Sequence, residues 1–153
     1  MNRNRHGSKR RRHRLRDWSY TQARRVLPYV SSVMRSIREH WLAAVRHDLA
    51  ARRLAAKPGR PDRDTLVAQE EAADEARKAN ERLQQAAQEL RAIDIYCLDP
   101  VTGEALIPFQ HADQLAWFIY NRFDQDPLRF WRFHDDPLEK RRPLAEVLAG
   151  DKA

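Results

Sequence analysis

Apolar residues recur at alternating steps of four and three from Ala23 onward, the spacing of one face of an α-helix. The pattern predicts a helix from about Thr21 to about Ala56, with Ser19 or Thr21 able to cap its start. At ~1.5 Å per residue such a helix is roughly 50 Å long. Its seam is formed by Ala23, Leu27, Val30, Met34, Ile37, Trp41 and Ala44.

A second helix with the same periodicity is predicted after a strong helix breaker. Residues 57–63 contain two prolines and a glycine, so the first helix should end there and the chain reverse. Asp64 is the expected cap of the second helix, which runs to about Ile93. Its heptad seam predicts coiled-coil packing in a thin antiparallel hairpin. The seam is Ala72, Ala76, Ala79, Leu83, Ala86, Leu90 and Ile93.

The aromatic residues concentrate where the hydrophobic period shortens towards two. Nine of the thirteen Phe, Trp and Tyr residues lie between Tyr96 and Phe133. This pattern predicts four short strands joined by turns, an antiparallel meander. Their expected ranges are 95–98, 105–110, 115–121 and 129–134. One face of the sheet should pack on the base of the hairpin, where Tyr20, Tyr29 and Trp41 would reach it.

These elements predict an α+β fold, a long helical hairpin packed at its base on a small antiparallel β-meander. Residues 17–153 form the single domain, divided into the hairpin (21–93), the meander (95–134) and a polar tail (135–153) that ends in a weak helix. No run of 18 apolar residues exists, so no membrane span is expected.

The net positive charge is confined to the first sixteen residues, which we expect to be a disordered basic arm. They contain eight cationic residues and no acid, whereas the rest of the chain has 21 Lys and Arg against 22 Asp and Glu. Such an arm can neutralise nucleic-acid phosphates without reading bases. A solvated tail, or a start codon placed too far upstream, is the simpler explanation. The candidate phosphate contacts are Arg3, Arg5, Lys9, Arg10, Arg11, Arg12, Arg14 and Arg16.

The order of several short motifs resembles the bacterial domain-of-unknown-function family twenty-two-oh-three over about residues 18–144. The motifs are Tyr20-Thr21-Gln22-Ala23, Leu27-Pro28, Asp99-Pro100-Val101-Thr102-Gly103, Ile107-Pro108-Phe109, Trp131 and Arg141-Arg142-Pro143-Leu144. The resemblance implies the hairpin-and-sheet fold and a bacterial cytosolic setting, and it implies no activity. Family members usually have a histidine directly after the fourth-strand tryptophan and a glycine before the closing basic pair. Arg132 and Lys140 stand there in this chain.

A cluster of basic residues surrounds the end of the fourth strand. It could bind an anionic ligand or an acidic partner, although local pairing with Asp135, Asp136 and Glu139 is the simpler expectation. The only enzymatic reading that survives depends on Trp131, Arg132 and His134 in this cluster. Its members are Arg129, Trp131, Arg132, His134, Arg141 and Arg142.

Other catalytic and metal-binding patterns are missing from the sequence. The four glycines are far apart, which excludes Gly-rich phosphate loops and the dinucleotide fingerprint. The histidine groups (His40 with His47, His111 with Asp113, His134 with Asp135 and Asp136) lack the spacing of a zinc site. The acidic residues Glu70, Glu71, Asp74 and Glu75 are expected to form a solvated helix face, and Cys97 to be a buried, inert thiol.

The sequence therefore favours a non-enzymatic cytoplasmic protein without a cofactor or metal, acting as a protein-interaction or scaffold module. Thin alanine-rich helices leave room for further burial, so self-association is expected, most simply as a homodimer that pairs two hairpins. The alternative is a nucleic-acid-associated accessory protein that binds phosphates through residues 1–16.

Overall fold

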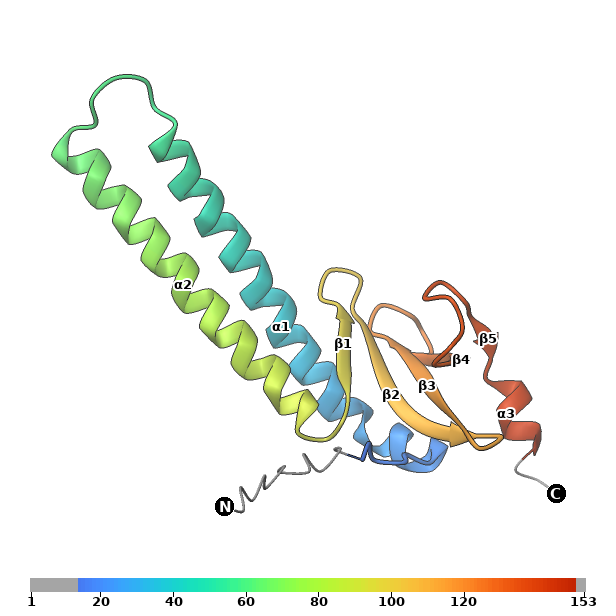
Figure 1. Ribbon diagram of the computed structural model, residues 1–153. Coiled ribbons are helices and arrows are strands. Elements are labelled where there is room, and N and C mark those ends of the chain that lie inside the picture. The colour runs from blue at the N-terminus through green and yellow to red at the C-terminus, as the bar shows by residue number, and fades with distance from the viewer. Residues whose placement is uncertain (1–13, 151–153) are drawn as a thin grey trace, which may run out of the picture.

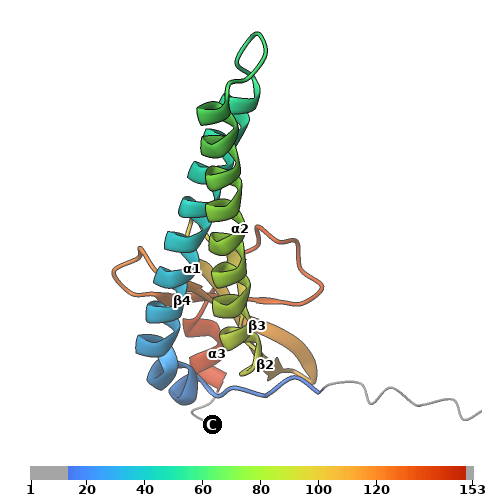
Figure 2. The same ribbon diagram turned by 90° about the vertical axis from the view of Figure 1, so that its left-hand side faces the viewer.

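A computed structural model describes residues 14–150 of the chain, and it has the predicted α+β architecture. Two long helices, α1 (Tyr20–Ala55) and α2 (Arg63–Arg91), form an antiparallel hairpin. A five-stranded antiparallel sheet lies against its base (Figure 1). Both views show the tip of the hairpin projecting well beyond the sheet (Figures 1 and 2). The distal part of the hairpin is therefore not covered by the sheet or by any other element within residues 14–150.

Both helices begin with side-chain caps. Ser19 Oγ accepts from the backbone N–H of Gln22 at 3.1 Å, and the Gln22 side chain accepts from Ser19 N, so a capping box starts α1. The prediction that Asp64 caps α2 is wrong, because Asp62 is the cap. Its carboxylate accepts from Thr65 N at 2.8 Å, three residues on, while Asp64 lies in the first turn.

The predicted heptad seams face one another. In α1 the buried residues include Ala23, Val30, Met34, Ile37 and Ala44, and in α2 the buried residues are Ala76, Ala79, Ala86 and Leu90. The other predicted seam residues, Ala72 and Leu83 in α2 and Ile93 just after its end, are half-buried. The small alanine side chains explain how the helices pack closely while burying little area.

The sheet is a simple meander in which each strand pairs with the next. Its strands are β1 (Tyr96–Asp99), β2 (Glu104–His111), β3 (Gln114–Asn121), β4 (Leu128–Phe133) and β5 (Arg142–Pro143). The sequence did not predict β5, because two residues carry no periodicity. Trp131 helps to hold it, since its indole N–H donates to the Pro143 carbonyl at 3.2 Å. The predicted terminal helix is α3 (Ala145–Gly150).

The main core lies between the hairpin and one face of the sheet. Phe118 of β3 stacks on Phe109 of β2 with ring centroids 3.9 Å apart, and Tyr20 of α1 meets the edge of Phe118. Tyr29 was expected to reach the sheet, and that prediction is wrong. It is 45% exposed and lines a different hollow with Trp18 and Ile93.

The segment before α1 is anchored, which corrects the expected extent of the arm. Trp18 is buried, and its backbone N–H and indole N–H donate to the carbonyls of Pro108 and Ile93. Arg16 N donates to the Asp94 carboxylate at 2.7 Å, and the Arg16 guanidinium lies 3.8 Å from the centre of the Trp18 ring. Leu15 packs with Leu106 and Trp117 on the outer face of the sheet, the face that lies opposite the main core. The prediction that the disordered arm extends to residue 16 is therefore wrong for Leu15 and Arg16.

Gly103, in the β1–β2 turn, offers a sharp test of the turn geometry. Its φ is +73°, and a Cβ there would lie 3.0 Å from the Arg122 Cβ and 3.2 Å from Phe123. We expect Gly103→Ala to lower the free energy of unfolding by about 2–4 kcal/mol, from backbone strain plus overpacking. The matched control is Gly59→Ala, where φ is +89° but nothing lies within 4 Å, so strain alone should cost about 1–2 kcal/mol. Equal losses in urea unfolding would show that the contacts at Gly103 do not matter.

No helix within residues 14–150 is long and apolar enough to cross a membrane.

Candidate functional site

The distal half of the hairpin exposes an apolar stripe on α1. Leu42, Val45 and Leu49 are 42%, 37% and 46% exposed, and their spacing places them on one flank of the helix. Arg38 lies four residues before Leu42 on the same helix. Its guanidinium is 5.5 Å from the centre of the ring of Phe123, a residue in the turn between β3 and β4. The stripe therefore continues the flank of α1 that contacts the sheet, beyond the point where the sheet ends.

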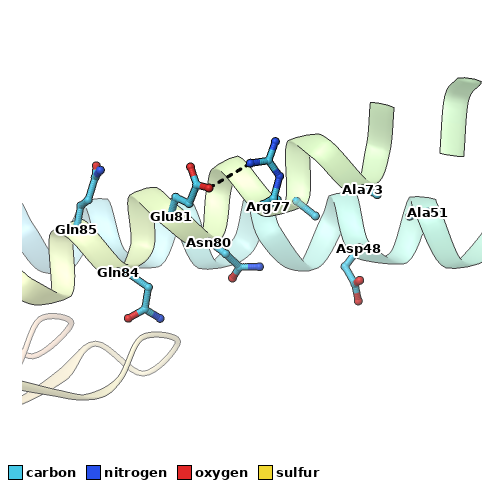
Figure 3. A pocket seen from close by; sticks show the side chains of 9 residues that line it. Asp48, Ala51, Ala73, Arg77, Asn80, Glu81, Gln84 and Gln85 are labelled. Carbon is cyan, nitrogen blue, oxygen red and sulfur yellow. Dashed lines mark hydrogen bonds and ion pairs between the residues drawn. The ribbon is translucent and has the colours of Figure 1, made fainter. Parts of the chain in front are cut away.

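A shallow groove of about 660 Å³ runs between the two helices in the same region (Figure 3). It is lined by Ala51, Ala73 and Ala76 and by polar side chains, most of them from α2. In Figure 3, Arg77 and Glu81 pair along one side of α2, and Asp48 of α1 points outward. A groove lined by methyl groups admits the side chains of another helix.

The two helices carry opposite charge. Helix α1 has seven arginines against two acids, whereas α2 has seven acids against five basic residues. Some charges pair within α2, where Asp74 binds both Arg77 and Lys78. The excess of each sign nevertheless remains on its own helix. The hairpin therefore offers a basic helix and an acidic helix side by side, to which charged groups of either sign on a partner could be complementary.

The predicted basic cluster does not form one site. Trp131 is buried in the core, and its ring meets Phe109 at 5.9 Å. Arg142 binds Asp136, with its Nε and Nη2 at 2.8 and 2.9 Å from the carboxylate oxygens, which is the local pairing that the sequence favoured. Arg129 and Arg141 also form ion pairs, but with carboxylates that the sequence did not suggest: Asp124 at 3.1 Å and Glu104 at 3.1 Å.

Arg132 and His134 lie on the outer face of the sheet, beside a hollow of about 360 Å³. Arg132 pairs across the strands with Trp117, whose indole N–H donates to His134 Nδ1 at 3.1 Å. Arg132 is the only arginine of the predicted cluster that forms no ion pair with the described residues, although it is only 4% exposed. The apolar part of the wall is formed by Leu15, Tyr96, Leu106, Leu115 and Trp117.

The pair of Arg142 and Asp136 makes a pH-dependent contribution to stability. The pKa of Asp136 is lowered from 3.8 to about 2, chiefly by the hydrogen bonds from Arg142, with smaller contributions from the Phe133 backbone N–H and the charges of Arg142 and Lys140. A carboxyl whose pKa is lower in the folded chain stabilises it above the unfolded pKa, and that stability is lost as the pH falls from about 4 to about 2. We expect Arg142→Met to return the pKa of Asp136 towards 3.8, as measured by carboxyl-carbon NMR titration. An unchanged titration would mean that Arg142 is not the cause.

The candidate nucleic-acid contacts fall into two groups. Arg3, Arg5, Lys9, Arg10, Arg11 and Arg12 lie outside the described residues. Arg14 is exposed, and Arg16 is engaged with Asp94 and Trp18. Phosphate binding by the arm stays a prediction, and a truncation that tests it should begin after residue 13 because Arg16 holds part of the fold.

The side chains considered for metal binding and nucleophilic chemistry are dispersed. Within residues 14–150, no group of three or more His, Cys, Asp and Glu residues could hold a metal ion. Cys97 is partly buried, and burial raises its pKa to about 11, with a smaller contribution from the charge of Asp99. At neutral pH it is therefore held as the thiol rather than as the nucleophilic thiolate.

Sequence reasoning missed several contacts between distant segments. Arg24 of α1 binds Asp126 of the β3–β4 turn at 2.9 Å, and Arg141 reaches Glu104 of β2. No local pattern signals either pair. The buried position of Arg132 could have been inferred, because strand alternation places it on the face opposite Trp131, where Trp117 is its neighbour.

Comparison with known proteins identifies a family but no activity. No curated protein and no solved structure shows a significant match to the chain. A protein-family profile described as "Uncharacterized conserved protein (DUF2203)" matches residues 16–144, beginning at the anchored Arg16 and ending at the buried Leu144. Since the match covers most of the chain, and covers both the hairpin and the sheet, the protein belongs to the DUF2203 family.

Proposed function

We propose that this protein is a non-enzymatic interaction module that associates with a second copy of itself through the distal hairpin. The observation that carries the proposal is the exposed apolar stripe of Leu42, Val45 and Leu49, beyond the edge of the sheet. Five of the ten large apolar side chains that are exposed in the described part of the chain lie between residues 42 and 67. Such concentration on one region is typical of an interaction surface.

The charges favour a second copy over an unrelated partner. In an antiparallel two-fold arrangement, α1 of each protomer lies beside α2 of the other, so the arginine-rich helix faces the acidic one twice. Leucines from the α1 stripe would then enter the alanine-lined groove of the partner. The result is a four-helix bundle. Such a bundle buries more apolar area than a thin two-helix hairpin can bury alone.

The sheet would then present its outer face away from the bundle. A scaffold of this shape displays two identical sheet platforms on a shared helical stalk. We place it in the cytoplasm, because the single cysteine suits a reducing compartment.

Complementary charge reversal tests the identity of the partner. The first variant is Arg46→Glu with Arg53→Glu on α1, and the second is Glu70→Arg with Glu81→Arg on α2; all four side chains are exposed. Each variant alone should weaken self-association, because like charges then face each other across the interface. Mixing the two should restore a heterodimer in native mass spectrometry. Weakened association that mixing does not restore would contradict the pairing of α1 with α2.

A further inference from the structure

The hollow on the outer face of the sheet combines apolar walls with one buried cation. Its volume is about 360 Å³, within the range of small-molecule sites. Tyr96 meets Trp117 edge to face at 5.9 Å, and Leu106 and Trp117 belong to a separate small core on this face. The Arg132 side chain lines the hollow and is 96% buried, since its exposed fraction is 4%.

The guanidinium of Arg132 is satisfied on one nitrogen only. Nη1 donates to the carbonyls of Phe133, His134 and Asp136 at 3.2, 3.3 and 3.4 Å. Among the described residues, Nε is fully buried without a hydrogen-bond partner and Nη2 donates no hydrogen bond. A carboxylate binds an arginine through two parallel N–H bonds from one edge of the fork. The edge formed by Nε and Nη2 has no partner among the described residues, and a carboxylate that binds it must displace the atoms that cover Nε.

Arg142 binds a carboxylate through the corresponding edge of its own guanidinium. Its Nε and Nη2 bind the two carboxylate oxygens of Asp136 at 2.8 and 2.9 Å. Asp136 also accepts from Phe133 N at 2.9 Å, so its carboxylate is already engaged. Arg129 and Arg141 pair with carboxylates of their own. The described residues thus leave Arg132 without a counter-ion.

An uncompensated cation in an apolar setting is costly to the fold. Burial lowers the pKa of Arg132 from its ordinary value, and the charge of Arg141 lowers it further, while Asp136 acts in the opposite direction. Apolar replacement of a buried charge is often neutral or stabilising. The three carbonyl bonds give Nη1 a structural role, whereas a ligand would account for the edge formed by Nε and Nη2, which has no partner among the described residues.

We propose that this hollow binds a small monocarboxylate with an apolar body. The carboxylate takes the Nε–Nη2 edge of Arg132, and the body lies against Leu106, Leu115 and Trp117. The indole N–H of Trp117 is already used by His134, so Arg132 supplies the charge recognition. The site lies on the sheet and is independent of the proposed hairpin interface.

The test is an NMR titration of the full-length protein with isovalerate, phenylacetate and indole-3-acetate. The reporters are the Arg132 Nε–H and the Trp117 indole N–H. We expect saturable shifts of both signals with at least one of the acids, and none with the corresponding amides, which lack the charge. No saturation by any acid below about 10 mM would overturn the proposal, as would equal binding of acid and amide.

Three variants separate the site from general effects. Arg132→Met should weaken binding by about tenfold to a hundredfold, since it removes a charged hydrogen-bond donor pair. Arg132→Lys, which keeps the charge but loses the fork, should bind with intermediate affinity and covers the case in which the methionine variant does not fold. Arg129→Met makes the same change at an exposed position of the same strand and should bind like the unchanged protein. Unchanged affinity in both Arg132 variants would refute the assignment.

Discussion

Replacing Leu42 and Leu49 together by aspartate is expected to convert the proposed dimer to a monomer of 18.1 kDa. Each leucine contributes about 1.5–3 kcal/mol when its side chain is buried, and each aspartate would instead place an unpaired charge in the interface. The dissociation constant should therefore rise at least a hundredfold, using about 1.4 kcal/mol for each factor of ten. Sedimentation velocity at a fixed protein concentration measures the shift.

The fold itself should survive this double substitution. Both leucines are nearly half exposed in the single chain, and aspartate in a helix costs only about 0.7 kcal/mol relative to alanine. Far-UV circular dichroism should therefore be unchanged. Leu138→Asp is the matched control, because Leu138 is 62% exposed in the connection between β4 and β5, away from the hairpin. A dimer that persists in the double variant would place the interface elsewhere.

Replacing Phe118 by alanine is expected to lower the free energy of unfolding by about 3–5 kcal/mol. Phe118 is 1% exposed and joins the two halves of the molecule. Its ring stacks on Phe109 of β2 and meets Tyr20 of α1, so its loss leaves a cavity between sheet and hairpin. Chemical denaturation measures the change.

Phe123→Ala is the matched control for this cavity. Phe123 is 59% exposed in the β3–β4 turn and contacts only the guanidinium groups of Arg38 and Arg122 among the ring and cation contacts of the described residues. The Phe123→Ala substitution should lower the free energy of unfolding by less than about 1 kcal/mol. A similar loss in both variants would mean that Phe118 does not hold the sheet to the hairpin.

Periodic elements could be predicted from the sequence because their signals are local. The heptad from Ala72 to Ile93 predicted the contact face of α2, and strand alternation predicted four strands of the meander. The cap of α2 was wrongly assigned because Asp62 and Asp64 both suit that role by composition. Only the geometry distinguishes them, through the bond to Thr65 N.

Features that depend on distant partners could not be predicted. High charge suggested that Leu15 and Arg16 belong to a disordered arm, but Trp18 anchors this segment through the carbonyls of Pro108 and Ile93. Strand β5 exists because β4 offers it a pairing edge. The basic cluster was inferred from proximity in sequence, whereas the alternation of β4 sends Trp131 and Arg132 to opposite faces.

Sedimentation equilibrium of the unchanged full-length protein tests the central claim most directly. Over roughly 1–100 micromolar, the fitted mass should rise towards twice 18.1 kDa, because the uncovered stripe and the opposite charges of the helices favour pairing. A single species of 18.1 kDa throughout that range would contradict the account.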